Sequence, residues 1–203
     1  MAQILKSYGA TVNDRVIAEA VDTLRRGGII VYPTDTMYAL GCDALNKRAV
    51  ERLCRVKGLD PEKNLLSVVC SGLSQAAEYA RIDNAAYTVM KDSVPGPVTF
   101  ILPSSTRLQR IFKGRRTVGV RIPDCATARA LAAELGNPLL TTSVHIDDAD
   151  AADAANPESL AMRYDSTADI VIDGGEGPLA QSAIIDITDP TDPVTIREHA
   201  ALG

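Results

Sequence analysis

One segment sets the architecture expected for this chain: Gly27-Gly28-Ile29-Ile30-Val31-Tyr32-Pro33-Thr34-Asp35-Thr36-Met37-Tyr38-Ala39-Leu40-Gly41-Cys42-Asp43. Its β-branched run, residues 29–32, is typical of a buried strand, and Pro33 should end that strand because proline cannot donate to a sheet. The polar side chains that follow are those of Thr34, Asp35, Thr36 and Tyr38. Ligands commonly bind at the carboxyl ends of strands in open α/β sheets, so this loop is either a binding loop or an ordinary capped turn.

Helical and strand patterns alternate on both sides of this segment. Capping signals and apolar periodicity predict helices over residues 14–26, 47–57, 74–79, 83–91 and 126–135, with another beginning at Asn156-Pro157. Apolar runs predict an edge strand at Ile4-Leu5 and strands over residues 65–70, 98–102, 117–122, 138–143, 169–173, 182–187 and 194–198. Residues 147–155 are small and acidic, without periodicity, and should form a mobile surface loop.

This alternation predicts a single α/β domain over residues 1–203. The consecutive strands near the end of the sequence predict a mixed sheet rather than a purely parallel one. A composition of 46% hydrophobic residues with no tryptophan requires an aliphatic core. The net charge of −5 argues against a protein that binds nucleic acid over its whole surface.

Cysteine and histidine usage argues against a metal centre. The four cysteines form no C-x-x-C pair and the chain has two histidines, so we expect no structural zinc. Scattered single cysteines fit a reducing compartment. With no signal-peptide pattern at the first residues and no membrane-length apolar run, we expect a cytoplasmic protein that does not enter a membrane.

The candidate site residues are basic or hydroxylic. Lys57 and Lys63 flank a polar loop, and hydroxyls gather at Thr34/Thr36, at residues 141–143 and at Ser182. Arg121 lies inside an apolar strand, so it must either form a structural salt bridge or face a polar cavity. If these groups share one cavity, they suit phosphates and carboxylates.

Other catalytic patterns are absent from the sequence. Ser143 and His145 do not make a nucleophile–base triad, because alternate residues of a strand share a face without being ordered as nucleophile and base. There is no Walker-type phosphate loop, and residues 174–177 lack the strand-to-helix context of a dinucleotide fingerprint.

Four motifs in the same order resemble the YrdC-like family, which includes the threonylcarbamoyl-AMP synthases. They are residues 32–41 of the opening segment, Pro95-Gly96-Pro97-Val98-Thr99, Val118-Gly119-Val120-Arg121-Ile122-Pro123 and Thr141-Thr142-Ser143, and in detail they are most similar to the YciO branch. The resemblance implies a twisted mixed sheet with a large open cavity. It also implies synthesis of threonylcarbamoyl-AMP and pyrophosphate from ATP, L-threonine and bicarbonate, for a tRNA modification. Mg²⁺ would accompany ATP, with no tightly bound cofactor.

The resemblance also implies residue roles. The residues implied to bind L-threonine are Thr34, Thr36, Tyr38, Arg121, Thr142 and Ser182. Those implied to bind the nucleotide are Lys57, Lys63, Ser143 and Arg197, and the first three of these are also the catalytic candidates. Catalysis in this family relies mainly on positioning and charge stabilisation, so it needs no triad.

Two departures from the family pattern bear on activity. The K-x-R motif reads Lys57-Gly58-Leu59 and the S-x-N motif reads Ser143-Val144-His145, so one arginine and one amide are replaced. A leucine cannot contact a triphosphate, so the synthase chemistry is weakened, lost or redirected to another small carboxylate or nucleotide.

A basic run offers an alternative function. Its members are Arg107, Arg110, Lys113, Arg115 and Arg116. They could bind the phosphates of tRNA or double-stranded RNA, as YrdC-like domains are described as doing, or they could form a solvated surface.

Overall fold

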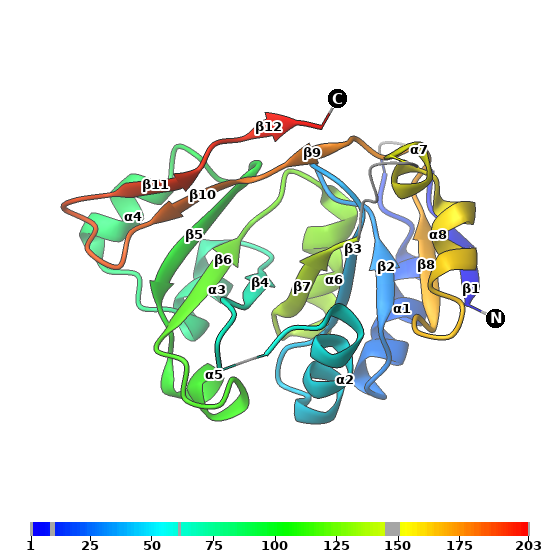
Figure 1. Cartoon of the computed structure of the whole chain (residues 1–203), viewed down its shortest axis with the longest axis horizontal. Helices are drawn as coiled ribbons and strands as arrows, with labels where there is room; N and C mark the ends of the chain where they lie inside the picture. Colours follow the sequence, from blue (N-terminus) through cyan, green and yellow to red (C-terminus); the bar gives the residue numbers. More distant parts are fainter. Residues whose placement is uncertain (1, 9–10, 61, 145–150, 203) are drawn as a thin grey trace.

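The fold is a mixed sheet with helices on both faces (Figure 1). The computed structural model describes residues 2–8, 11–60, 62–144 and 151–202. Within these residues the sheet has ten strands, in the spatial order β1 (Gln3–Lys6), β8 (Ile170–Asp173), β2 (Ile30–Tyr32), β3 (Ala39–Asp43), β7 (Leu139–Ser143), β4 (Ser67–Val69), β6 (Thr117–Arg121), β5 (Val98–Pro103), β10 (Ala183–Asp186) and β11 (Val194–Arg197). Two short strands, β9 (Ala180–Gln181) and β12 (Ala200–Ala201), pair separately.

The strand directions divide the sheet into two parts. At one edge β1, β8 and β2 are parallel, so their carboxyl ends lie together. From β2 onward most pairs are antiparallel, including β2–β3, β3–β7, β7–β4 and β6–β5, while β4–β6 and β5–β10 are parallel. The predicted mixed α/β sheet is therefore confirmed.

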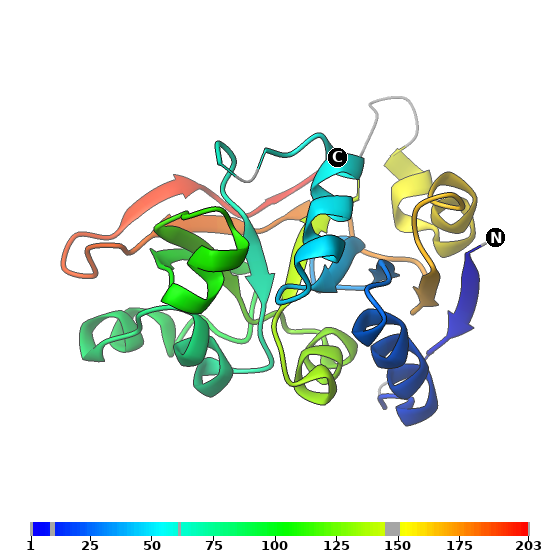
Figure 2. The same cartoon turned by 90° about the horizontal axis from the view of Figure 1, so that it is seen from below.

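The helices cover both faces of this sheet. They are α1 (Asp14–Arg25), α2 (Lys47–Lys57), α3 (Leu73–Tyr79), α4 (Asn84–Met90), α5 (Thr106–Ile111), α6 (Ala126–Leu135), α7 (Ala151–Ala155) and α8 (Pro157–Arg163). Figure 2 shows the blue α1 beside the lime α6 on one face, with the cyan α2 and the yellow α8 on the other. Asn13 and Asn46 accept from the first turns of α1 and α2, and Gly58 ends α2 in the left-handed region at φ 64°.

Strand β2 shows how the aliphatic sequence fills both cores. Ile29 and Val31 pack on the face of α2, while Ile30 and Tyr32 pack on the face of α1 and α6. All four are fully buried. Successive side chains of a strand point to opposite faces, so a continuous apolar run is what a strand covered on both sides requires.

The structure corrects two sequence-based expectations. The end of the opening segment, where no strand was predicted, forms strand β3, which pairs with β2 over Ile30–Gly41, Val31–Leu40 and Tyr32–Ala39. Residues 151–155 form α7, so the surface loop expected over residues 147–155 is wrong there, and its residues 147–150 lie outside the described residues. Neighbouring alanines have high helix propensity, which outweighs the missing periodicity.

The described residues contain no helix that is both long and apolar enough to cross a membrane.

Candidate functional site

The loop between β2 and β3, residues 33–38, is shaped by one threonine hydroxyl. Thr34 Oγ1 donates to the carbonyl of Met37 at 2.6 Å and accepts from the backbone N–H groups of Thr36 and Met37 at 3.2 and 3.3 Å. A hydroxyl that bonds to nearby backbone closes a tight turn. The turn fixes where the neighbouring Asp35 and Thr36 side chains point.

Asp35 and Thr36 hold the guanidinium of Arg121, which enters from β6. Arg121 Nη2 lies 2.5 Å from Asp35 Oδ1 and donates to Thr36 Oγ1 at 2.7 Å. Both charged side chains are 10% exposed. Asp35 Oδ2 also accepts from the backbone N–H of Asp124 at 2.8 Å, so the carboxylate is held from both sides.

Arg121 also has unused hydrogen-bonding capacity. Its Nε is buried and has no hydrogen-bond partner among the described residues. Buried N–H groups normally have an acceptor, and leaving one unpaired costs about 1–3 kcal/mol. The two alternatives for Arg121 therefore both hold: it forms a structural salt bridge and it faces a cavity.

That cavity, which we call the Arg121 cavity, has a volume of about 190 Å³. It lies on one face of the sheet between β3 and β10. It is lined by Met37, Ala39, Leu59, Leu65, Leu66, Ser67, Thr99, Arg121, Thr141, Thr142, Ser143, Ser182, Ile184 and Arg197. Five of the predicted site residues therefore meet here, namely Arg121, Thr142, Ser143, Ser182 and Arg197.

A second guanidinium faces Arg121 from β11. Arg197 Nε donates to the carbonyl of Ser182 at 3.0 Å, and the Ser182 hydroxyl lies 3.2 Å from that of Thr99. Partial burial, and then the positive charge of Arg121, lower the pKa of Arg197. Among the described residues, Arg121 forms an ion pair with Asp35, whereas Arg197 has no ion-pair partner. Two cations with one carboxylate leave a net positive charge, which favours an anion.

Gly119 explains why hydroxyls can reach this surface. A Cβ at Gly119 would lie 2.3 Å from Ser67 Oγ and 3.0 Å from Thr99 Cγ2. No side chain fits at that separation. Glycine in the Val-Gly-Val-Arg motif therefore leaves the space in which the Ser67 and Thr99 side chains stand beside Arg121.

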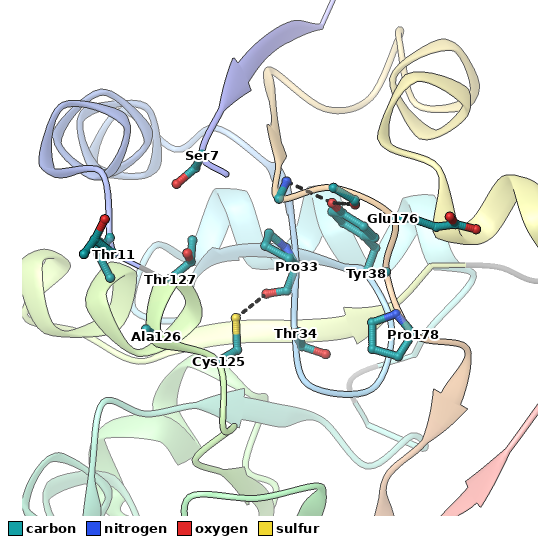
Figure 3. A pocket seen from close by; sticks show the side chains of 14 residues that line it. Ser7, Thr11, Pro33, Thr34, Tyr38, Cys125, Ala126, Thr127, Glu176 and Pro178 are labelled. Carbon is teal, nitrogen blue, oxygen red and sulfur yellow. Dashed lines mark hydrogen bonds between the residues drawn. The ribbon is translucent and has the colours of Figure 1, made fainter. Parts of the chain in front are cut away.

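Two predicted threonine-binding residues face elsewhere. Thr34 and Tyr38 line a different cavity at the ends of β1, β8 and β2, which we call the strand-end cavity (Figure 3). Tyr38 Oη donates to the carbonyl of Gly175 at 2.7 Å and accepts from the N–H of Gly174 at 3.0 Å. Burial raises the pKa of Tyr38 to about 12. The hydroxyls of both residues are thus engaged in holding loops.

The two predicted lysines are not among the described residues that line the Arg121 cavity. Lys63 is 84% exposed and lies 3.8 Å from Asp60. Lys57 is half-buried, and burial and then the charge of Arg163 lower its pKa. The motif position that does line the cavity is Leu59, next to Leu65 and Leu66. His145 lies outside the described residues.

The basic run makes several contacts inside the molecule. Arg107 donates to Tyr79 Oη at 3.2 Å and stacks over its ring. Arg115 donates to the carbonyls of Glu62 and Lys63 at 3.2 Å, and Lys113 pairs with Glu62 at 3.6 Å. Among the described residues, no side-chain hydrogen bond or ion pair is found for the other two members of the run, Arg110 and Arg116.

Sequence reasoning assigned no role to Asp35, Ser67 or Thr99. Asp35 is the carboxylate that holds Arg121, and the other two supply hydroxyls to the cavity. The sequence did contain one signal for a role of Asp35, because this carboxylate stands between two threonines in the opening segment. Its partner is 86 residues away, and no local pattern connects the two.

Comparison with known proteins identifies the class. The Sua5/YciO/YrdC family model, described as "Telomere recombination", matches residues 22–199. The YciO protein of Escherichia coli K12, described as uncharacterized, is 37% identical over 98% of this chain and 96% of its own. Its crystal structure superposes with a TM-score of 0.88 over 100% of this chain and 98% of that one. The chain therefore belongs to the Sua5/YciO/YrdC family.

The similarity to threonylcarbamoyl-AMP synthases covers a smaller part of the aligned sequences. A threonylcarbamoyl-AMP synthase of Thiobacillus denitrificans is 39% identical over 60% of this chain and 65% of its own. P. abyssi Sua5, whose crystal structure is a complex with L-threonine, has a TM-score of 0.84 and 28% identity, covering 97% of this chain and 57% of that one. This protein is thus similar to YciO along its length and to the synthases over part of theirs.

Proposed function

We propose that this protein is a threonylcarbamoyl-AMP synthase of reduced efficiency. It would convert ATP, L-threonine and bicarbonate into threonylcarbamoyl-AMP, pyrophosphate and water, in support of tRNA modification in the cytoplasm. Family membership and similarity to named synthases support this assignment. The similarity to an L-threonine complex of Sua5 supports L-threonine as the amino-acid substrate.

The observation that carries the proposal is the unpaired Nε of Arg121 in a cavity lined by hydroxyls. Asp35 and Thr36 fix the guanidinium through Nη2, which leaves Nε as the unpaired donor for a substrate carboxylate. Pre-organised donors bind a carboxylate without losing side-chain entropy at the moment of binding. The Ser182 and Thr142 hydroxyls would orient the remainder of the amino acid.

The nucleotide would extend toward Arg197 and Ser143. Arg197 would neutralise phosphate charge as pyrophosphate leaves, and Mg²⁺ would arrive bound to the phosphates of ATP. Leu59, Leu65 and Leu66 line the same cavity and offer phosphates no hydrogen bond. A missing charge-assisted contact of about 3 kcal/mol corresponds to about a hundredfold lower rate, which is the basis for proposing reduced efficiency.

The test is pyrophosphate release by the purified protein from ATP, Mg²⁺ and bicarbonate, with and without L-threonine. L-valine is the matched control, because it has the shape of threonine without the hydroxyl. We expect slow release that requires L-threonine and bicarbonate and that L-valine does not support. Release that is independent of the amino acid, or no release with no detectable L-threonine binding by calorimetry, would contradict the proposal.

RNA binding by the basic run is not the function that we favour. Three of its five cations already contact Tyr79 or the loop at residues 62–63, so fewer are free to neutralise phosphates. Titration of the protein with tRNA at two salt concentrations tests this preference. Tight, steeply salt-dependent binding without pyrophosphate release would favour the RNA-binding alternative.

A further inference from the structure

The strand-end cavity lies on the other side of residues 33–38 from the Arg121 cavity. Its volume is about 330 Å³, within the range of small-molecule sites. Ser7, Pro33 and Gly174 line it, and each is the residue that follows one of the parallel strands β1, β2 and β8. The crevice at the carboxyl ends of parallel strands is a common ligand position in α/β sheets.

The amino end of α6 forms another wall of this cavity. Ala126 and Thr127, the first two residues of the ten-residue helix, line it. The N-cap residue is Cys125, whose side chain makes no capping hydrogen bond and instead donates to the carbonyl of Pro33. A thiol is a weak acceptor, so the first N–H groups of the helix lack a strong one.

Ser7 supplies a second, independent observation. It is 8% exposed, and its Oγ is buried without a hydrogen-bond partner among the residues that the structure describes. Figure 3 shows the Ser7 hydroxyl directed into the space that Thr11 and Thr127 also border. Since buried hydroxyls are normally paired, this arrangement points to a partner that binds in the cavity.

The charges around the cavity define the class of ligand. Its described lining contains no lysine or arginine, and Glu176, its one carboxylate, points away from Ser7 in Figure 3. Burial raises the pKa of the Cys125 thiol, the nearby backbone N–H groups of Ala128 and Thr127 lower it, and the smaller effects of Asp35 and Arg129 oppose each other. An anion would find no cationic side chain in this described lining, and a cation would meet the positive end of α6. A neutral ligand meets neither penalty.

We propose that the strand-end cavity binds a small neutral polyhydroxyl molecule of pentose size. Hydroxyl groups both donate and accept, which matches the Ser7, Thr11 and Thr127 hydroxyls and the N–H groups of α6. Pro33 and Pro178 offer apolar surface for the carbon skeleton (Figure 3). This site is separate from the proposed synthase chemistry and does not depend on it.

D-ribose is the probe, titrated into the ¹⁵N-labelled full-length chain to about 50 mM because sugars bind single sites weakly. We expect saturable shifts of the amide signals of Gly174, Gly175, Ala126 and Thr127. Inorganic phosphate is titrated in parallel. Absence of saturable shifts with ribose, or saturable binding of phosphate at these amides instead, would overturn the proposal.

Two variants separate binding from folding. Ser7→Ala removes an unpaired buried hydroxyl, so it should weaken ribose binding about three- to tenfold while leaving the melting temperature unchanged or higher. Thr127→Val should weaken binding similarly, and Thr88→Val, whose hydroxyl bonds within α4, should leave it unchanged. A lower melting temperature of Ser7→Ala with unchanged ribose affinity would assign Ser7 a structural role and refute the site.

Neither variant alters Arg121, so pyrophosphate release should persist in both. If the protein releases pyrophosphate but does not bind ribose, only this proposal fails. If it binds ribose but does not release pyrophosphate, only the synthase assignment fails.

Discussion

The two cavities share residues 33–38 as a wall but differ in charge. On one side, Arg121 and Arg197 face a surface of hydroxyls, with Asp35 as the paired carboxylate. On the other side, the described lining has hydroxyls and the end of α6 but no cation. The hydroxyls of Thr34 and Thr36 lie 3.2 Å apart, and Thr34 lines one cavity while Thr36 holds the guanidinium of the other. One short loop thereby separates the proposed carboxylate site from the proposed site for a neutral ligand.

The largest effect is expected from removing Arg121. Arg121→Ala should lower L-threonine affinity at least about a hundredfold, measured by calorimetry. It should also lower the free energy of unfolding by about 3–5 kcal/mol, because Asp35 is left buried without its partner.

A double variant separates these two effects. Arg121→Met with Asp35→Leu replaces the ion pair by apolar groups and should recover most of the stability while L-threonine binding stays lost. Recovery of binding in the double variant would show that Arg121 acts only through the fold.

The next effect concerns Leu59 in the same cavity. Leu59→Arg restores the arginine of the K-x-R motif and should raise pyrophosphate release about tenfold, with a further rise when His145→Asn is added. Leu65→Arg is the matched control, because it adds the same charge elsewhere in the cavity lining. Equal gains from both arginines would mean that charge alone, not its position, limits the rate.

A third variant tests how closely β6 and β4 must approach. Gly119→Ala should lower the free energy of unfolding by about 1–3 kcal/mol, measured by chemical denaturation, since its Cβ would lie 2.3 Å from Ser67 Oγ. Gly72→Ala is the control, because nothing lies within 4 Å of its Cβ. Equal effects at both positions would refute the crowding argument.

The smallest effect is expected from Tyr38, beside the strand-end cavity. Tyr38→Phe should lower the free energy of unfolding by about 1 kcal/mol, because Gly174 N–H and the Gly175 carbonyl lose their partner. The raised pKa of Tyr38 means that its contribution is complete below pH 10 and is lost as pH rises toward about 12, when the unfolded tyrosine ionises first. Denaturation curves between pH 8 and about 11.5 should therefore fall less steeply for the variant. Identical pH dependence would contradict this role for Tyr38.

Local signals accounted for most of the helices and strands. Helix α2 was predicted at its observed bounds, because Asn46 caps it and Gly58 ends it within the same short stretch. Strand β3 was missed, because its hydrogen bonds with β2 and β7 arise from partners that periodicity does not reveal. The mixed character of the sheet followed from the order of elements alone.

The candidate site could be predicted only in part. Arg121 was identified because a charge in an apolar strand demands a partner, but Asp35 could not be assigned as that partner from local sequence. Thr34 and Tyr38 were grouped with Thr36, since a sequence does not show to which side each residue of a turn points. The hydroxyl group of Ser7 gave no signal at all, because its significance depends on burial.

The pairing of Arg121 with Asp35 has a consequence for the speed of exchange. A carboxylate that enters the cavity would share the Arg121 guanidinium with Asp35, so it would gain less from Arg121 than from an arginine without an ion-pair partner. For the proposed L-threonine ligand this predicts a short residence time, and the Arg121–Asp35 pair would restore the resting state once the acid departs. Under the proposed synthase function, release of the product should then be fast.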